Sequence, residues 1–134
     1  MGIKQTLKKI FSTSTESSEN HYEEQLQTHY YKVMKDKALQ EVEAMLKNRQ
    51  GYKVVSISEA HGEIIVNVKK GKKAFLVATV IMIRPLRTAV DFSVSTDTIF
   101  FSDFGHSKKI VEGLYKELDS RLQFVGTGLG NELS

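Results

Sequence analysis

The sequence predicts an α+β fold: an antiparallel four- or five-stranded meander sheet with two helices packed on one face, plus an N-terminal amphipathic helix. Three observations lead to this prediction. Four strand-like stretches follow one another with turns of hairpin length between them, one amphipathic helix precedes them, and a second helix follows them. The 134 residues, 40% of them hydrophobic, are enough for one core. We therefore expect a single α+β domain over residues 21–125.

The N-terminal residues 1–11 carry apolar side chains at helical spacing, and lysines border this stripe. Because the lysines interrupt the apolar run, the segment does not match a secretory signal peptide. Residues 12–20 contain no apolar residue and predict a flexible polar linker. The amphipathic segment is a candidate for contact with a membrane or a partner through Ile3, Lys4, Leu7, Lys8, Lys9, Ile10 and Phe11.

The domain begins with an extended entry segment at residues 26–34, and a helix follows it. Asp36 is the expected N-cap of this helix, and Gly51 ends it. One face of the helix is lined by apolar groups and one aliphatic stem, and this face is expected to pack on the sheet. It consists of Ala38, Leu39, Val42, Met45, Leu46 and Arg49.

Alternation of apolar and polar residues predicts the four strands. In the second and fourth strands one face is apolar and the other polar, whereas the third is apolar on both faces. The third strand is therefore expected to be central, or to meet another surface, such as a second copy in a homodimer. A last helix carries an apolar stripe from Ile110 to Leu122, and residues 126–134 form a loose tail. The predicted strands are Tyr52–Ser58, Glu63–Lys69, Ala74–Ile83 and Arg87–Thr96.

Composition narrows the cellular setting. The net charge of +3 is too small to indicate nucleic-acid binding by itself. The chain has no cysteine, which excludes disulfides and thiolate chemistry and fits a cytoplasmic location. The longest apolar run, Ala74–Ile83, is far shorter than the roughly 20 residues that a membrane-spanning helix needs. We expect a cytoplasmic protein that is soluble or membrane-peripheral.

The segment before the last helix carries a short motif. Residues 102–105 read Ser-Asp-Phe-Gly, Ser107 follows, and residues 108–109 are a basic pair. This pattern resembles the end of an uncharacterised bacterial domain family, in which a Ser-Asp-Leu/Phe-Gly step, an Asn and two basic residues open the final helix. The resemblance covers residues 27–124, but residues 92–96 lack the arginines that the family carries there. It implies a bacterial source and the same order of elements, and it implies no activity.

The same segment is a candidate anion site. Free amide protons and the dipole at a helix N-terminus favour a phosphate or carboxylate. The alternative is that Asp103 or Ser107 simply caps the helix while Gly105 permits the turn. The candidate residues for anion binding are Ser102, Asp103, Gly105, Ser107, Lys108 and Lys109.

No catalytic site can be named from the sequence. The histidines at positions 21, 29, 61 and 106 lack metal-ligand spacing, so no metal and no cofactor is predicted. Asp91, Ser93 and Ser95 fit a solvated strand face better than a nucleophilic site. The lysine-rich turn at residues 69–73 has no interleaved aromatic residue, so nucleic acid is an unlikely partner.

These observations predict a non-enzymatic binding or adaptor domain. Its N-terminal helix docks back on the domain, binds a groove of a protein partner, or lies on an anionic membrane surface. The alternative function is a small-anion or small-molecule binder, or a weak enzyme, that uses the N-terminus of the last helix at Ser102–Lys109.

Overall fold

The computed structural model describes residues 14–16, 27–69, 73–96 and 106–127, and it confirms the α+β class, the antiparallel sheet and the two helices. The predicted N-terminal helix lies outside the described residues. The helices are α2 (Lys35–Lys47) and α3 (His106–Arg121). The strands are β1 (Ser14–Glu16), β2 (His29–Tyr31), β3 (Tyr52–Ser58), β4 (Glu63–Val68), β5 (Ala74–Arg84), β6 (Arg87–Thr96) and β7 (Phe124–Thr127).

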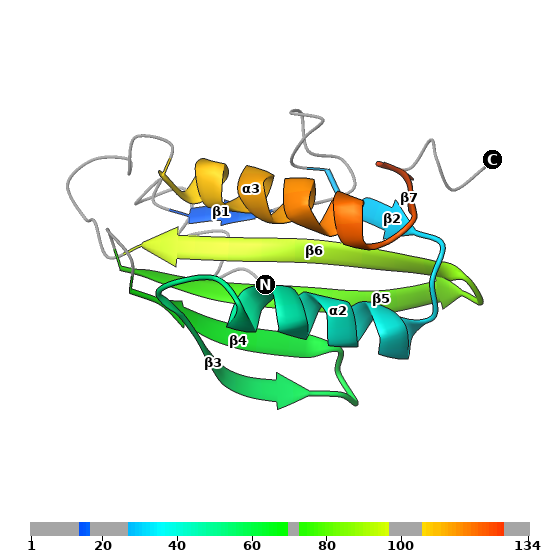
Figure 1. Ribbon diagram of the computed structural model, residues 1–134, viewed down its shortest axis with the longest axis horizontal. Helices are drawn as coiled ribbons and strands as arrows, with labels where there is room; N and C mark the ends of the chain where they lie inside the picture. Colours follow the sequence, from blue (N-terminus) through cyan, green and yellow to red (C-terminus); the bar gives the residue numbers. More distant parts are fainter. Residues whose placement is uncertain (1–13, 17–26, 70–72, 97–105, 128–134) are drawn as a thin grey trace, which may run out of the picture.

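Six of these strands form one sheet in the order β3-β4-β5-β6-β2-β7. β1 joins the same sheet by pairing with the last residues of β6, beyond the stretch of β6 that pairs with β2. All described pairings are antiparallel. β5 lies between β4 and β6, which confirms the expectation that the strand with two apolar faces is central. Figure 1 shows α2 and α3 side by side on the same side of the sheet.

The core lies between this sheet face and the two helices. Because side chains alternate along a strand, every second residue of β4, of β5 from Ala74 to Val80 and of β6 from Thr88 to Val94 points toward the helices and is buried. The helices contribute one apolar stripe each. The largest fully buried side chains are Tyr30, Tyr31, Tyr115, Phe92, Met45, Leu46, Ile64, Leu76, Leu114, Leu118 and Val42.

The first helix starts slightly earlier than predicted. Its N-cap is Met34, and no side chain caps it, whereas the sequence suggested Asp36. Asp36 lies in the first turn instead, where its negative charge interacts favourably with the helix dipole. The helix also ends earlier than predicted, at Lys47 with Asn48 as its C-cap, whereas the sequence suggested Gly51. Gly51 lies in the turn that follows, where its φ of 83° leads the chain into β3.

The turn between β3 and β4 is held against β5. Gly62 is buried, has a φ of 65°, and its carbonyl oxygen accepts the N–H of Val80 at 2.7 Å. A Cβ on Gly62 would lie 2.1 Å from the carbonyl oxygen of Val80. The close approach of the two backbones and the positive φ both require glycine at this position.

Two short strands extend the sheet beyond the predicted domain boundaries. Residues 14–16, inside the predicted linker, form β1 and pair with Ser93–Ser95. Gly126 and Thr127, inside the predicted tail, belong to β7 and pair with β2. Within the described residues no helix is long and apolar enough to cross a bilayer.

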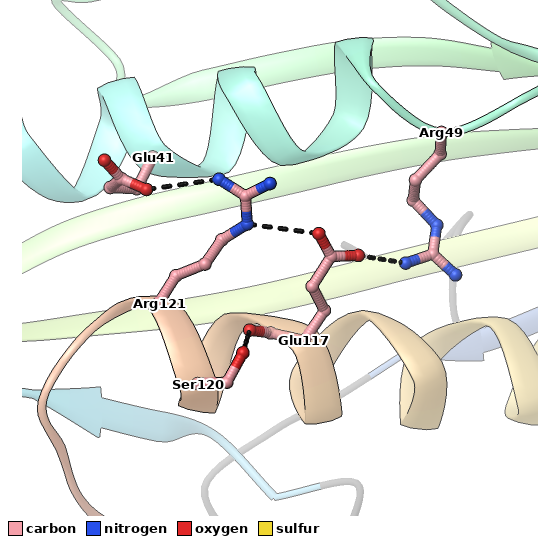
Figure 2. Close-up of polar contacts among 5 residues, drawn as sticks. All are labelled: Glu41, Arg49, Glu117, Ser120 and Arg121. Atoms are coloured by element: carbon pink, nitrogen blue, oxygen red, sulfur yellow. Dashed lines mark hydrogen bonds and ion pairs between the residues drawn. The ribbon is translucent and has the colours of Figure 1, made fainter.

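The two helices are joined by a chain of four alternating charges (Figure 2). Glu117 of α3 accepts from Arg49 at 2.6 Å and from Arg121 at 3.1 Å. Arg121 also reaches Glu41 of α2 at 3.3 Å. The side chains are 24% to 34% exposed, so solvent screens these ion pairs only in part.

We expect Glu117→Gln to lower the free energy of unfolding by about 1 kcal/mol, because it removes the carboxylate shared by two arginines. Urea unfolding at low and at high salt should show a larger loss at low salt. The control is Glu43→Gln, which breaks a single exposed pair with Lys47 in α2 and should cost less than half as much. Equal losses for the two variants would contradict a linked network.

Candidate functional site

The predicted anion site is only partly covered by the structure. Ser102, Asp103 and Gly105 lie outside the described residues. Ser107 is fully buried in the first turn of α3, Lys108 is half-buried, and Lys109 is exposed. The two lysines therefore differ in environment, and only Lys109 presents itself fully to solvent. The candidate contact residues of the N-terminal segment, from Ile3 to Phe11, also lie outside the described part.

A buried polar cluster joins β2 to α3. The imidazole Nδ1 of His29 lies 2.9 Å from Asp119 Oδ1, and the Tyr31 hydroxyl donates to the same oxygen at 2.6 Å. The His29 ring stacks on the Tyr115 ring with centroids 3.6 Å apart. The centroid of the Phe124 ring lies 4.9 Å from that of His29. This contact could not be predicted from a sequence pattern, because 90 positions separate His29 from Asp119.

A histidine oriented by a carboxylate is an arrangement that general bases use. In this cluster, however, His29 is only 6% exposed, and its buried Nε2 atom has no hydrogen-bond partner among the residues that the structure describes. A substrate would have to reach that nitrogen through the packed rings around it. The contacts therefore account for the cluster as a link between sheet and helix.

Burial, reinforced by the hydrogen bond to Asp119, raises the pKa of the Tyr31 hydroxyl well above its ordinary value of 10.0. The unfolded chain therefore loses this proton near its ordinary pKa while the native chain keeps it. The contribution of the Tyr31 hydroxyl to the free energy of unfolding is therefore fully present below about pH 10. Above that pH it falls by about 1.4 kcal/mol per pH unit.

We expect Tyr31→Phe to lose this pH dependence, because phenylalanine has no proton to release. Urea unfolding from about pH 8 to about pH 11 would measure it. The difference in the free energy of unfolding between the wild type and Tyr31→Phe should become smaller above about pH 10. Parallel profiles for the two proteins would show that Tyr31 ionises equally in the folded and unfolded states.

A second region, at the β5–β6 hairpin end, differs from the cluster because it is open to solvent. It comprises residues 32–34, 81–87 and 123–125, and we call it the hairpin-end surface. Figure 1 shows the β5–β6 turn, the connection after β2 and β7 at the same end of the sheet. Thr88 Oγ1 donates to the Val33 carbonyl at 2.6 Å and so ties the first two of these segments together.

The hairpin-end surface carries only positive charge. Three cations come from two segments, and none of its residues is acidic. They surround a depression of about 490 Å³ with one aromatic wall. Its lining residues are Lys32, Arg84, Pro85, Leu86, Arg87, Gln123, Phe124 and Val125.

Exposed apolar side chains are concentrated in the same three segments. Of the nine large hydrophobic side chains that the described residues leave exposed, six belong to the hairpin-end surface. Apolar side chains exposed singly are ordinary, whereas a group of them beside one another marks a contact surface. The six are Met34, Ile81, Met82, Ile83, Leu86 and Phe124.

The hairpin-end surface was not predicted from the sequence. The pair of arginines around Pro85 and Leu86 was visible as a local signal, since a two-residue connection places its flanking residues opposite each other. The contributions of Lys32 and Phe124 were not visible, because they depend on β2 and β7 reaching the same end of the sheet.

Neither a metal site nor the polar face of β6 provides a further candidate site in the described residues. In the described part of the chain no three His, Cys, Asp or Glu residues lie close enough together to hold a metal ion. Asp91 on the polar face of β6 accepts the Thr28 hydroxyl at 2.7 Å, so this carboxylate has a structural contact. Comparison of the chain with protein-family models, with curated proteins and with solved structures gave no match.

Proposed function

We propose that the protein is a non-enzymatic binding domain that acts at an anionic membrane surface on the cytoplasmic side. The observation that carries the proposal is the composition of the hairpin-end surface, whose three segments contribute six exposed apolar side chains, three cations and no acidic residue. Apolar side chains partition into the interfacial layer of a bilayer, and cations are attracted to lipid phosphates. A surface with both properties is more stable in contact with an anionic bilayer than exposed to water.

The buried cluster supports the non-enzymatic part of the proposal. His29 and Asp119 resemble an acid–base pair, but the free imidazole nitrogen is enclosed. The other contacts described for the cluster are ring contacts and hydrogen bonds that pack the sheet and the helix, including the Tyr115 hydroxyl donating to the Val90 carbonyl at 2.6 Å. These residues serve the packing of α3 on β2 and β6.

The N-terminal segment at residues 1–11 is the second proposed contact. Its sequence combines an apolar stripe with three lysines, as peripheral membrane helices do. One weak anchor gives only marginal binding, and stable attachment needs two signals. The segment and the hairpin-end surface together would supply them.

Sedimentation with vesicles tests this function on the full chain. We expect the wild type to pellet with vesicles of phosphatidylcholine and phosphatidylglycerol and to remain in the supernatant with phosphatidylcholine alone. Replacing Lys4, Lys8 and Lys9 by glutamine should weaken the partitioning roughly a hundredfold, because each lysine at an anionic surface contributes about 1 kcal/mol.

The matched control removes the same charge from exposed lysines at the far end of the folded body, in the triple variant Lys47→Gln, Lys53→Gln and Lys73→Gln. This control should partition nearly as well as the wild type. A wild-type protein that stays in the supernatant with both kinds of vesicle would exclude the proposed function.

A further inference from the structure

The β5–β6 turn places two arginines at the outermost point of the hairpin-end surface. Arg84 and Arg87 are cross-strand partners, and Pro85 and Leu86 connect them. This pairing brings two guanidinium groups to one turn, and guanidinium groups bind phosphate oxygens through paired hydrogen bonds. Lys32 adds a third positive charge, and its backbone N–H donates to the Gln123 carbonyl at 2.9 Å, which holds this residue beside the depression.

The backbone of the same turn presents apolar side chains to the outside. Leu86 has a φ of 61°, a conformation that favours glycine, yet the position holds a leucine that is 49% exposed. Ile83 lies at the irregularity where the register of β5 against β6 shifts, and it is 45% exposed. A strained backbone conformation that holds an apolar side chain in water points to a contact made there.

We propose that the hairpin-end surface inserts end-on into an anionic bilayer. The side chains of Ile83 and Leu86 enter the interfacial layer, and Lys32, Arg84 and Arg87 bind the phosphate groups of lipid headgroups around the depression. This inference rests on the proposed function and deepens it, since it names the inserting residues and directs the long axes of β5 and β6 toward the membrane. Charge complementarity favours an anionic bilayer as the occupant, because the three segments of the surface contribute three cations and no acidic residue.

Two variants of the full chain separate the apolar and the charged contributions. Leu86→Gly removes the inserting side chain, while glycine adopts this φ without strain and so preserves the turn. We expect it to weaken partitioning to phosphatidylglycerol-containing vesicles roughly tenfold. Arg84→Gln combined with Arg87→Gln should weaken partitioning roughly 30-fold, since each cation contributes about fivefold.

The matched control is Phe75→Ser. Phe75 is 47% exposed and belongs to the same strand as Arg84, but it lies roughly 30 Å from the turn. The Phe75→Ser variant should therefore partition as the wild type does. High salt supplies a second readout. The arginine effect should shrink because salt screens charges, whereas the Leu86→Gly effect should persist. Thermal unfolding of each variant verifies that the fold is intact.

The outcomes distinguish this inference from the proposed function. If the wild type pellets with the vesicles and both hairpin variants pellet as well as the wild type, the inference is wrong. The variant of the N-terminal lysines then tests whether residues 1–11 make the membrane contact. A Phe75→Ser loss equal to that of Leu86→Gly would also overturn it, because the contact would then lie along the whole open face of β5. If the wild type does not pellet, the proposed function and this inference fail together, and a protein partner becomes the occupant to seek.

Discussion

Replacing Gly62 by alanine is expected to cause the largest loss of stability of any single methyl group added to this protein. The new Cβ would lie 2.1 Å from the Val80 carbonyl oxygen, and real Cβ atoms do not approach that closely. The backbones must separate, which breaks the bond from the Val80 N–H to the Gly62 carbonyl, and alanine at a φ of 65° adds strain. We expect a loss of about 4 kcal/mol and a Tm lower by roughly 15 °C.

Gly113→Ala provides the matched control, because it is the same substitution at a position that has room for a Cβ. It lies within α3, and the nearest atom to its added Cβ is Arg49 Nη2 at 3.5 Å, an ordinary contact. Alanine should stabilise the helix by about 0.5–1 kcal/mol. Thermal unfolding followed by circular dichroism would therefore show shifts of opposite sign. A Gly62→Ala protein with a wild-type Tm would contradict the close approach of this turn to β5.

Asp119→Ala is expected to have the second largest effect. The carboxylate accepts from two groups on β2, His29 Nδ1 and the Tyr31 hydroxyl, and both are buried. Each donor that loses its acceptor in a buried place costs about 1–3 kcal/mol. We expect the variant to lose about 3 kcal/mol in urea unfolding.

The neighbouring Ser120→Ala is the control, since the Ser120 hydroxyl donates to the Glu117 carbonyl at an exposed position and should cost little. A double-mutant cycle of Asp119→Ala with Tyr31→Phe isolates the shared contact. The two losses should not add, because Tyr31→Phe removes one of the donors that Asp119→Ala leaves unsatisfied. Fully additive losses would show that the two side chains act independently.

The long elements could be predicted because each carries its own periodic pattern. Tyr52–Ser58 and Arg87–Thr96 have the bounds expected from alternation, and the central place of β5 followed from its two apolar faces. The apolar stripe of α3 was likewise visible at helical spacing. In these stretches the local pattern and the tertiary packing agree.

The short strands could not be predicted in the same way. β1 has three residues and β7 has four, too few for an alternation to be distinguished from chance, and their pairing depends on partners far along the chain. The strand count of four or five was therefore too low. Met34 as an uncapped helix start was also not visible, since Asp36 offered a better local signal.

The candidate surface depended on the same distant pairings. The charges of Arg84 and Arg87 were readable, but the positive φ of Leu86 was not, because Pro-Leu does not specify a left-handed residue. The placement of Lys32 and Phe124 beside this turn follows from β2 and β7 together. Sequence patterns that report on one element at a time do not contain this information.

The position of β2 has a consequence for how the protein is made. β2 comes early in the chain, yet its two neighbours in the sheet are β6 and β7, which are synthesised late. During translation β2 has no hydrogen-bonding partner in the sheet until residues 88–90 of β6 have emerged, and its other neighbour, β7, emerges later still. The emerging chain thus exposes an aromatic strand until β6 is available, and the four-residue strand β7 covers the second edge of that strand afterwards.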